Sequence, residues 1–477
     1  MISKYKIVLS ILTVLSCSLH LLHAQRISAG GWHSLAICND STVKGFGENA
    51  TGQLGNGSNT DSNIPVSTSG LTSIVSVSGG GDQLEAHSLA LKADGTVWAW
   101  GSNLYGGLGN GSNNNTNTPV QTLLLNDIIS IAAGGWHSVA LKNDGTVWTW
   151  GWNTDGQLGD GSTTDRSIAA VVNGLQGITH IASGTYHVLA LKNDGTVWAW
   201  GDNVSGQLGN STTVDALSPI QVQGLSNIVA IAAGRFFSLA IKNDGSVWTW
   251  GENLYGQLGN GTTLDSPIPV QVNGVAAAIP AIVACGAFHV ALVKNDGTTC
   301  SWGRNTYGNL GNGTVNNSST PVLVQSMSNV ASIAAGTNFT LYHKSDGSFW
   351  ACGRNTSGQL GDGTNLQQNT VVQASTLCPI LSVPTSINDV LPTPISASIY
   401  PNPSSNRSFY IQTDISEPAN ATLYVETYSG QRLYESILTI SAKQQTKIDL
   451  PKQIHQGMYI VRLTTKDRQY VGKITLQ

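Results

Sequence analysis

A unit of about 50 residues recurs seven times along this chain of 477 residues. Each copy closes on a glycine, and these glycines are spaced 54, 50, 50, 50, 52 and 50 residues apart: Gly47, Gly101, Gly151, Gly201, Gly251, Gly303 and Gly353. A second signature, Gly-Gln-Leu-Gly in most copies, begins five residues after each of them. A fixed period of this size indicates a repeat architecture, in which each unit buries its apolar face against its neighbours.

Each copy contains four strand-like runs. In the third copy they are Ile128–Gly134, His137–Asn143, Thr146–Gly151 and Ala169–Gly174. Asn143-Asp144-Gly145 separates the second run from the third and favours a tight hairpin, because Gly tolerates the positive φ of such turns. Four strands at a period near 50 match a propeller blade better than a helical solenoid. We therefore predict an all-β, seven-bladed β-propeller.

The tryptophans fit this architecture. Trp148 and Trp150 lie two residues apart on one predicted strand, so both point to the same face. Together with the equivalent pairs of three other copies they would fill the wedge between blades. Closing the ring also limits exposed strand edges.

The first 24 residues are typical of a secretory signal peptide. Lys4 and Lys6 precede the apolar run Ile7–Leu15, and Leu22-His23-Ala24 is an acceptable cleavage site. Lipoprotein acylation at Cys17 is the poorer alternative, because the bulky Leu15 suits it badly. We expect an exported mature chain from Gln25 with no transmembrane helix, since no later segment is apolar over about 18 residues.

Five cysteines remain after that cleavage: Cys38, Cys285, Cys300, Cys352 and Cys378. Their scatter and the lack of a Cys-x-x-Cys pair argue against a disulfide framework and against a zinc site. Cys300 and Cys352 stand where other copies carry Trp, so we expect buried apolar fillers. A bridge between these two stays open as an alternative.

The pairing of "ALKNDGTVWTWG" (Ala140–Gly151) with "GQLGDG" (Gly156–Gly161) resembles the regulator of chromosome condensation repeat family, and all seven copies fit over Ile27–Thr376. Kelch repeats do not explain the second signature, and no Trp-Asp dipeptide of the WD type occurs. The resemblance implies a propeller and, for the founding member, a chromatin-bound guanine-nucleotide exchange factor. An extracellular member inhibits β-lactamases through its loop face.

Two features set this chain apart from the founding member. Export removes it from any cytosolic GTPase. From Gln25 to Val390 there are 12 Lys and Arg against 21 Asp and Glu, whereas binding nucleic acid requires a basic face. The resemblance therefore implies the fold, and we expect no nucleic-acid partner.

Residues 396–477 follow a Pro-bearing linker, 377–395, and contain several strand-like runs that predict a small immunoglobulin-like β-sandwich. The segment resembles the type A C-terminal sorting domain of the Bacteroidota type IX secretion system. The residues that carry the resemblance are Tyr400, Pro401, Asn402, Pro403, Gly457 and Lys473. The resemblance implies a transport address read by the secretion machinery, after which the protein is released or attached to the cell surface. An ordinary immunoglobulin-like binding module is the alternative.

His137, Ser138 and Asp144 are the residue types of a nucleophilic triad. The histidine position, however, holds Phe237 and Phe339 in two other copies, so this slot accepts a ring without acid-base function. We interpret the histidines as packing and hydrogen-bonding residues, and Asp144 as a turn former. We predict no catalytic residue, no metal and no cofactor.

Binding is therefore expected in the loops, on a rigid scaffold. The second copy carries a four-residue insert, which we expect to protrude and to contact a partner: Asp82, Gln83, Leu84 and Glu85. The polar stretches Ser112–Thr118 and Ser162–Ser167 would line one rim.

Taken together, the sequence predicts domains at 1–24, 25–376, 377–395 and 396–477. The expected function is a monomeric, non-enzymatic binding or adhesion scaffold that is secreted or attached to the outer surface of a Gram-negative bacterium, with a protein or glycan ligand. Two alternatives remain: an exchange-factor-like regulator of a GTPase, and an exported hydrolase with its site at the propeller channel.

Overall fold

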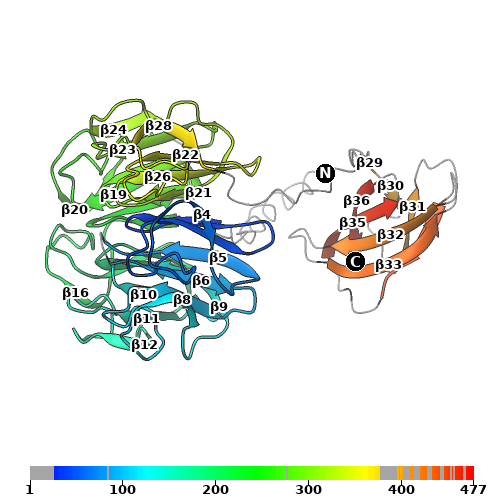
Figure 1. Ribbon diagram of the computed structural model, residues 1–477, viewed down its shortest axis with the longest axis horizontal. Coiled ribbons are helices and arrows are strands. Elements are labelled where there is room, and N and C mark those ends of the chain that lie inside the picture. Colours follow the sequence, from blue (N-terminus) through cyan, green and yellow to red (C-terminus); the bar gives the residue numbers. More distant parts are fainter. Residues whose placement is uncertain are drawn as a thin grey trace, which may run out of the picture. The chain divides into compact units, whose positions relative to one another are not determined.

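The computed structural model describes residues 26–82, 85–275 and 278–375, together with the C-terminal segments 395–396, 398–400, 408–412, 419–426, 432–440, 445–451, 454, 457–465 and 469–476. The chain divides into two compact units, Met1–Ile380 and Leu381–Gln477. All regular elements of the described residues are strands (Figure 1). No helix among them is long and apolar enough to cross a membrane.

The first unit is a ring of seven four-stranded antiparallel blades, each built from consecutive strands, which confirms the predicted seven-bladed propeller. Blade 1 comprises β1 (Ile27–Ala29), β2 (His33–Ile37), β3 (Val43–Gly47) and β4 (Ser62–Ser67). Blade 2 comprises β5 (Ile74–Gly79), β6 (His87–Lys92), β7 (Val97–Gly101) and β8 (Thr116–Gln121). Blade 3 comprises β9 (Ile128–Ala133), β10 (His137–Lys142), β11 (Val147–Gly151) and β12 (Arg166–Val171). Blade 4 comprises β13 (Ile178–Ser183), β14 (His187–Lys192), β15 (Val197–Gly201) and β16 (Ala216–Gln221).

The remaining blades follow the same order. Blade 5 comprises β17 (Ile228–Ala233), β18 (Phe237–Lys242), β19 (Val247–Gly251) and β20 (Ser266–Gln271). Blade 6 comprises β21 (Ala278–Cys285), β22 (His289–Lys294), β23 (Thr299–Gly303) and β24 (Ser318–Leu323). Blade 7 comprises β25 (Val330–Ala335), β26 (Phe339–Lys344), β27 (Phe349–Gly353) and β28 (Gln368–Gln373).

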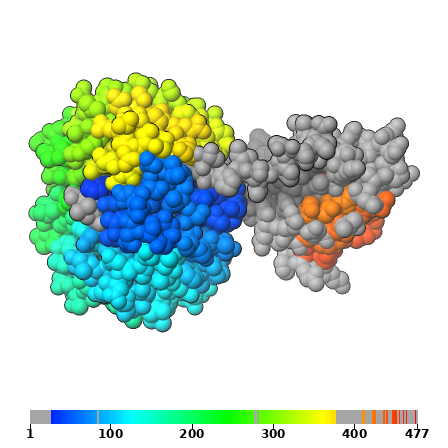
Figure 2. Space-filling view, in the orientation of Figure 1, coloured from blue at the N-terminus to red at the C-terminus, as the bar shows by residue number. Residues whose placement is uncertain are grey.

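Backbone hydrogen bonds close the ring, and no strand is exchanged between blades 1 and 7. Around the central channel, the turn after each first strand donates an N–H to a carbonyl of the same turn in the next blade, at 2.9 to 3.4 Å. The last of these seven bonds joins Thr337 N to Gly31 O at 3.2 Å. In a second set, the loop that precedes each fourth strand donates an N–H to a carbonyl of the next blade's fourth strand, and this set ends with Gly363 N to Asn63 O at 2.9 Å. Blade 1 accordingly lies directly beside blade 7 (Figure 2).

The predicted tryptophan wedge is present between the blades. Trp150 is fully buried, and its indole N–H donates to the carbonyl of Gly107 in the preceding blade at 2.8 Å. Trp148 is partly exposed and contacts the same core cluster. Equivalent bonds are made by Trp100, Trp200, Trp250 and Trp302. Each of these five wedges thus combines apolar burial with one satisfied indole donor.

The cysteines behave mostly as apolar fillers. Cys300 and Cys352 are free and buried, so the alternative bridge between them is not formed. Cys352 takes the place of a wedge tryptophan, and its thiol lies 3.5 Å from the carbonyl oxygen of Asn309. Cys38, directly after β2, is disulfide-bonded, and its partner lies outside the described residues.

The second unit forms two sheets that share a core centred on Phe409, Leu423 and Val461. A five-stranded sheet has the order β29-β36-β35-β32-β33, and a three-stranded sheet has the order β30-β31-β34. The bounds are β29 (Ile395–Ser396), β30 (Ser398–Tyr400), β31 (Ser408–Gln412), β32 (Ala419–Glu426), β33 (Arg432–Ile440), β34 (Gln445–Asp449), β35 (Gly457–Thr465) and β36 (Gln469–Leu476). The immunoglobulin-like assignment of this unit stays a prediction.

Candidate functional site

The repeated histidines are buried connectors between blades. His33 Nε2 lies 2.9 Å from Ser88 Oγ of the next blade, and that hydroxyl donates to the carbonyl of Gln53 back in blade 1. The hydroxyl therefore accepts from Nε2–H, which makes the ring a neutral Nε2–H tautomer. His87, His187 and His289 contact a Ser or Thr hydroxyl of the next blade in the same way.

The triad-like residues of the third copy do not form one site. His137 contacts Ser183 of blade 4 at 2.9 Å, and Ser138 accepts from His87 of blade 2 and donates to Gly107 O. Asp144 caps its own hairpin by accepting from the backbone N–H and hydroxyl of Thr146. The three side chains serve three different contacts, which confirms the packing interpretation of His137 and the turn role of Asp144.

The two ends of the propeller differ in kind. In each blade the turn between the first and second strands and the loop after the third strand lie at the same end, because the strands are antiparallel. We call this end the mouth face and the opposite end, with the hairpins between the second and third strands, the hairpin face. All seven lysines of the propeller lie in or beside those hairpins: Lys44, Lys92, Lys142, Lys192, Lys242, Lys294 and Lys344. The mouth face carries residues that change from blade to blade.

Aromatic side chains gather on the mouth face of blades 2 to 5. Trp136 and Trp152 meet edge to face with ring centroids 5.3 Å apart, and Tyr105 contacts both. Tyr186 contacts both tryptophans at 5.8 Å and stacks on Phe236 at 4.9 Å. These rings are neither buried nor fully exposed. They form a continuous, partly exposed apolar surface across four blades.

Two arginines continue this surface through blades 6, 7 and 1. The Arg304 guanidinium carbon lies 5.0, 5.3 and 5.9 Å from the ring centroids of Tyr255, Phe288 and Tyr307. The Arg354 carbon lies 4.0 and 5.5 Å from the centroids of Trp32 and Tyr307. We call the complete set the aromatic belt: Trp32, Tyr105, Trp136, Trp152, Tyr186, Phe236, Tyr255, Phe288 and Tyr307.

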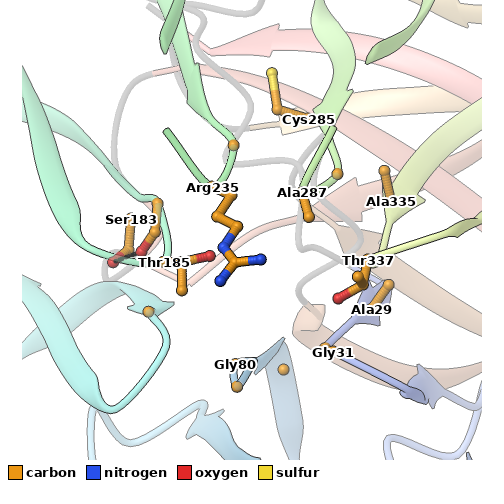
Figure 3. Close-up of a pocket in the computed structure, with 18 of the residues that line it drawn as sticks. Ala29, Gly31, Gly80, Ser183, Thr185, Arg235, Cys285, Ala287, Ala335 and Thr337 are labelled. Atoms are coloured by element: carbon orange, nitrogen blue, oxygen red, sulfur yellow. Dashed lines mark hydrogen bonds between the residues drawn. The ribbon is translucent and has the colours of Figure 1, made fainter. Parts of the chain in front are cut away.

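A third arginine lies inside the belt and points into the central channel. Arg235, from the turn after β17, reaches over the channel wall toward Gly80 (Figure 3). It forms an ion pair with Asp82 at 2.8 Å, and the Tyr186 hydroxyl donates to the same carboxylate at 3.1 Å. Blades 2, 4 and 5 are thereby joined across the channel. The cavity there is about 70 Å³, below the size of an ordinary ligand pocket.

The structure corrects the prediction for the first residue of the inserted loop in the second copy. Asp82 does not protrude: it is 8% exposed because the ion pair with Arg235 draws it into the channel. Glu85 is half-buried and makes an isolated β-bridge with Asp82. Gln83 and Leu84 lie outside the described residues. Partner binding by the insert stays a prediction.

The polar stretches on the rim are ordered by asparagines. Ser112 and Asn114 offer backbone carbonyls to the Asn103 amide, and Ser162 and Thr164 do the same for Asn153. Much of each stretch is exposed. Their expected role as a binding rim stays a prediction.

Several carboxyl groups on the mouth face have a raised pKa. Burial raises the pKa of Glu48 to about 7 and that of Asp202 to about 6. Burial also raises the pKa of Glu252 and Asp155. Each of these acids comes from the loop after a third strand. Since arginine stays protonated at any physiological pH, protonation of Glu48 near pH 7 and of Asp202 near pH 6 makes the face more positive than its residue count suggests.

The belt could have been found by aligning the seven copies and reading the positions that differ. One position lies just before the histidine slot, as in Trp136 and Tyr186, and another just after the closing glycine, as in Trp152 and Arg304. The signal is the change of residue type at these two positions from copy to copy. Among the described residues there is no cluster of His, Cys, Asp and Glu suited to a metal ion.

The predicted sorting residues lie partly within the described strands. Tyr400 ends β30 and pairs with Tyr410, Gly457 begins β35 opposite Leu476, and Lys473 pairs with Ile460. Pro401, Asn402 and Pro403 lie outside the described residues.

Comparison with known proteins agrees with this architecture. The RCC1-like domain model matches residues 117–401, and regulator of chromosome condensation (RCC1) repeat models match residues 42–91 and residues 25–53 and 85–106. The secretion system C-terminal sorting domain model matches residues 398–477.

Individual relatives share only part of their length with this chain. The mouse E3 ubiquitin-protein ligase HERC2 is 32% identical over 24% of this chain and 2% of its own length. The Arabidopsis thaliana ultraviolet-B receptor UVR8 is 32% identical over 25% of this chain and 27% of its own.

Two solved structures share the fold over most of their length. Human WBSCR16 has a TM-score of 0.59 at 25% identity, covering 65% of this chain and 83% of its own. A structure of yeast RCC1 (Prp20) with Kap60 has a TM-score of 0.64 at 21% identity, covering 74% and 86%. The chain belongs to the RCC1-like domain family and carries a C-terminal secretion system sorting domain.

Proposed function

We propose that the chain is an exported, non-enzymatic binding module that holds a protein partner on its mouth face. The sorting domain supports secretion by the type IX machinery and a location outside the cell or on its surface. The finer assignment, protein binding, is supported by the aromatic belt. Nine rings and three arginines contact one another around one mouth, while the hairpin face repeats one lysine hairpin.

The composition of the belt favours a protein partner. The cores of protein interfaces are enriched in Trp, Tyr, Phe and Arg and depleted of Lys, and the residues that dominate binding energy are most often Trp, Tyr and Arg. The mouth face carries these residue types and none of the propeller's lysines. The rings are also held by their neighbours, so little side-chain entropy is lost on binding.

Trp152 and Trp136 are the expected centre of this surface. A phage library of disulfide-closed, 12-residue random loops would be selected on the full mature chain, and the affinities of purified winning loops would be measured by interferometry. Replacing either tryptophan by alanine is expected to weaken those loops about 30-fold, since truncating a central aromatic costs roughly 2 kcal/mol or more.

Trp98→Ala is the matched control. Trp98 is also a partly exposed tryptophan, but it lies near the hairpin face with Lys92 5.5 Å from its ring. Loops that lose affinity in the Trp98 variant and keep it in the Trp152 and Trp136 variants would place binding on the wrong face. Loops insensitive to all three changes would also refute the proposal.

A further inference from the structure

Arginine occupies the mouth face of three successive blades. Arg235 comes from the turn after β17, whereas Arg304 and Arg354 are the first residues after the closing glycines of blades 6 and 7. In blades 1, 4 and 5 that same position holds an acid, Glu48, Asp202 or Glu252. Blades 6 and 7 therefore carry a positive charge at the position where blades 1, 4 and 5 carry an acidic side chain.

The three guanidinium groups differ in how their charge is met. Arg235 has its ion pair with Asp82 at 2.8 Å. Arg304 donates one hydrogen bond, to the Thr306 hydroxyl at 3.4 Å, and Arg354 one, to the Thr356 hydroxyl at 2.9 Å. Among the described residues, no carboxylate makes a salt bridge with Arg304 or Arg354.

One acid acts on Arg354 from a distance. Glu48, in blade 1, interacts electrostatically with Arg354, but it is buried and its carboxylate accepts from Gln53 Nε2 at 3.3 Å. The Glu48 carboxylate therefore bonds within its own loop and makes no salt bridge with the Arg354 guanidinium among the described residues. A guanidinium has five N–H donors, so most of those on both arginines have no acceptor within the part of the chain that the structure describes.

Both guanidinium groups are held in place before any ligand binds. Tyr307 lies between them, with its ring centroid 5.9 Å from Arg304 and 5.5 Å from Arg354. Stacking on further rings, Phe288 for Arg304 and Trp32 for Arg354, restricts their rotamers. A planar, preorganised fork of N–H donors matches a carboxylate, and charge-assisted pairs of this kind are the strong ones.

The surroundings distinguish a carboxylate from a nucleic-acid phosphate. Phosphate backbones are met by an extended run of cations, whereas this site has two arginines on a propeller with an excess of acids. Two separate guanidinium groups surrounded by aromatic rings instead suit the carboxylates of acidic side chains on a protein loop.

We propose that Arg304 and Arg354 form a carboxylate-binding site, on either side of Tyr307, for Asp or Glu side chains of an acidic protein loop. This inference rests on the proposed function and specifies the chemistry of the partner.

The test uses the same loop selection on the full mature chain. Winning loops are expected to be enriched in Asp and Glu over the unselected library. Arg304→Gln and Arg354→Gln should each weaken a winning loop about 10- to 100-fold, the loss expected for a hydrogen bond to a charged group. Changing the loop's own Asp to Asn should give a similar loss against the unmodified chain, and the two losses should be non-additive. The loss measured for the Asp-to-Asn loop against the unmodified chain does not depend on how the arginine variants fold.

Lys344→Gln is the matched control for charge and stacking. Lys344 lies on blade 7 like Arg354, and its ammonium lies 5.5 Å from the Trp350 ring centroid, but at the hairpin face. This variant should leave the affinity within about twofold, as expected for a surface charge away from the binding site.

Four outcomes would overturn the inference. Winning loops without acidic enrichment would do so, as would an affinity loss in Lys344→Gln equal to that in Arg304→Gln. Arginine-dependent binding of polygalacturonate without any acidic loop would assign the site to a glycan instead. If Trp152→Ala weakens the loops while Arg304→Gln and Arg354→Gln do not, the proposed function stands and the carboxylate site fails.

Discussion

Lowering the pH from 7 to about 4.5 is expected to destabilise the propeller strongly, because buried histidines are neutral in the fold and protonated in the unfolded chain. Burial lowers the pKa of five of them to about 3 or 4: His33, His87, His137, His187 and His289. In four of the five, Nδ1 is buried without a partner among the described residues, so a proton there would have no acceptor.

The sign and size follow from proton linkage. Below the unfolded histidine pKa of about 6.5, unfolding takes up protons, and each proton lowers the folding equilibrium constant about tenfold per pH unit. The raised pKa values of Glu48 and Asp202 act oppositely, because these groups bind protons in the folded state between pH 7 and their unfolded values. We expect unfolding to be accompanied by a net uptake of about three protons at each pH between 6 and 4.5.

Urea unfolding of the full mature chain as a function of pH measures this uptake. His289→Phe should make the pH dependence shallower by one proton, because both neighbouring blades already carry Phe in that slot, at Phe237 and Phe339. The half-buried His180, changed to Gln, is the control. A stability that is flat between pH 7 and 4.5, or unaltered in its slope by His289→Phe, would show that the buried histidines do not titrate as stated.

Gly151→Ala is expected to cost the propeller several kcal/mol, far more than Gly174→Ala in the same blade. Both glycines have positive φ, +102° and +83°, so both changes carry the roughly 1–2 kcal/mol cost of a side chain in that region. A Cβ on Gly151 would lie 2.5 Å from the carbonyl oxygen of Trp136 and 2.8 Å from the His137 Cα. A Cβ on Gly174 would meet no atom within 4 Å.

The difference between the two variants isolates the close approach of the backbone from the dihedral cost. It arises because Gly151 closes the third strand against the turn that carries Trp136, and so sets the position of the belt. Denaturant melts at pH 7 would measure both free energies of unfolding. Equal losses for Gly151→Ala and Gly174→Ala would mean that this contact does not hold the turn.

The parts of the molecule that recur were predictable. The hairpin of Asn143-Asp144-Gly145 depends on bonds within its own turn, whereas the wedge formed by Trp150 and the connector role of His137 depend on contacts with the adjacent blade. These interactions recur in the repeats, so a residue that several copies share at one position indicates the same interaction in each of them. Phe237 and Phe339 in the same slot indicate that it accepts a ring without acid-base function.

The parts that depend on the closed ring were not predictable. Asp82 meets Arg235 across the channel from three blades away, and no property of the insert indicates that partner. A polar insert is ordinarily expected to be exposed, but the ion pair with Arg235 buries Asp82. The contact between Trp32 and Arg354 has the same origin, because these two residues become neighbours only when blade 7 reaches blade 1.

The central claim, that partners bind at the mouth face, is tested most directly by hydrogen–deuterium exchange of the full mature chain with and without a selected loop. The account predicts slowed exchange in the turns that carry Trp136, Tyr186 and Phe288 and in the loops after Gly151 and Gly303, with the hairpins around Asp144 and Asp244 unchanged. Protection confined to those hairpins, or to the C-terminal unit, would contradict it.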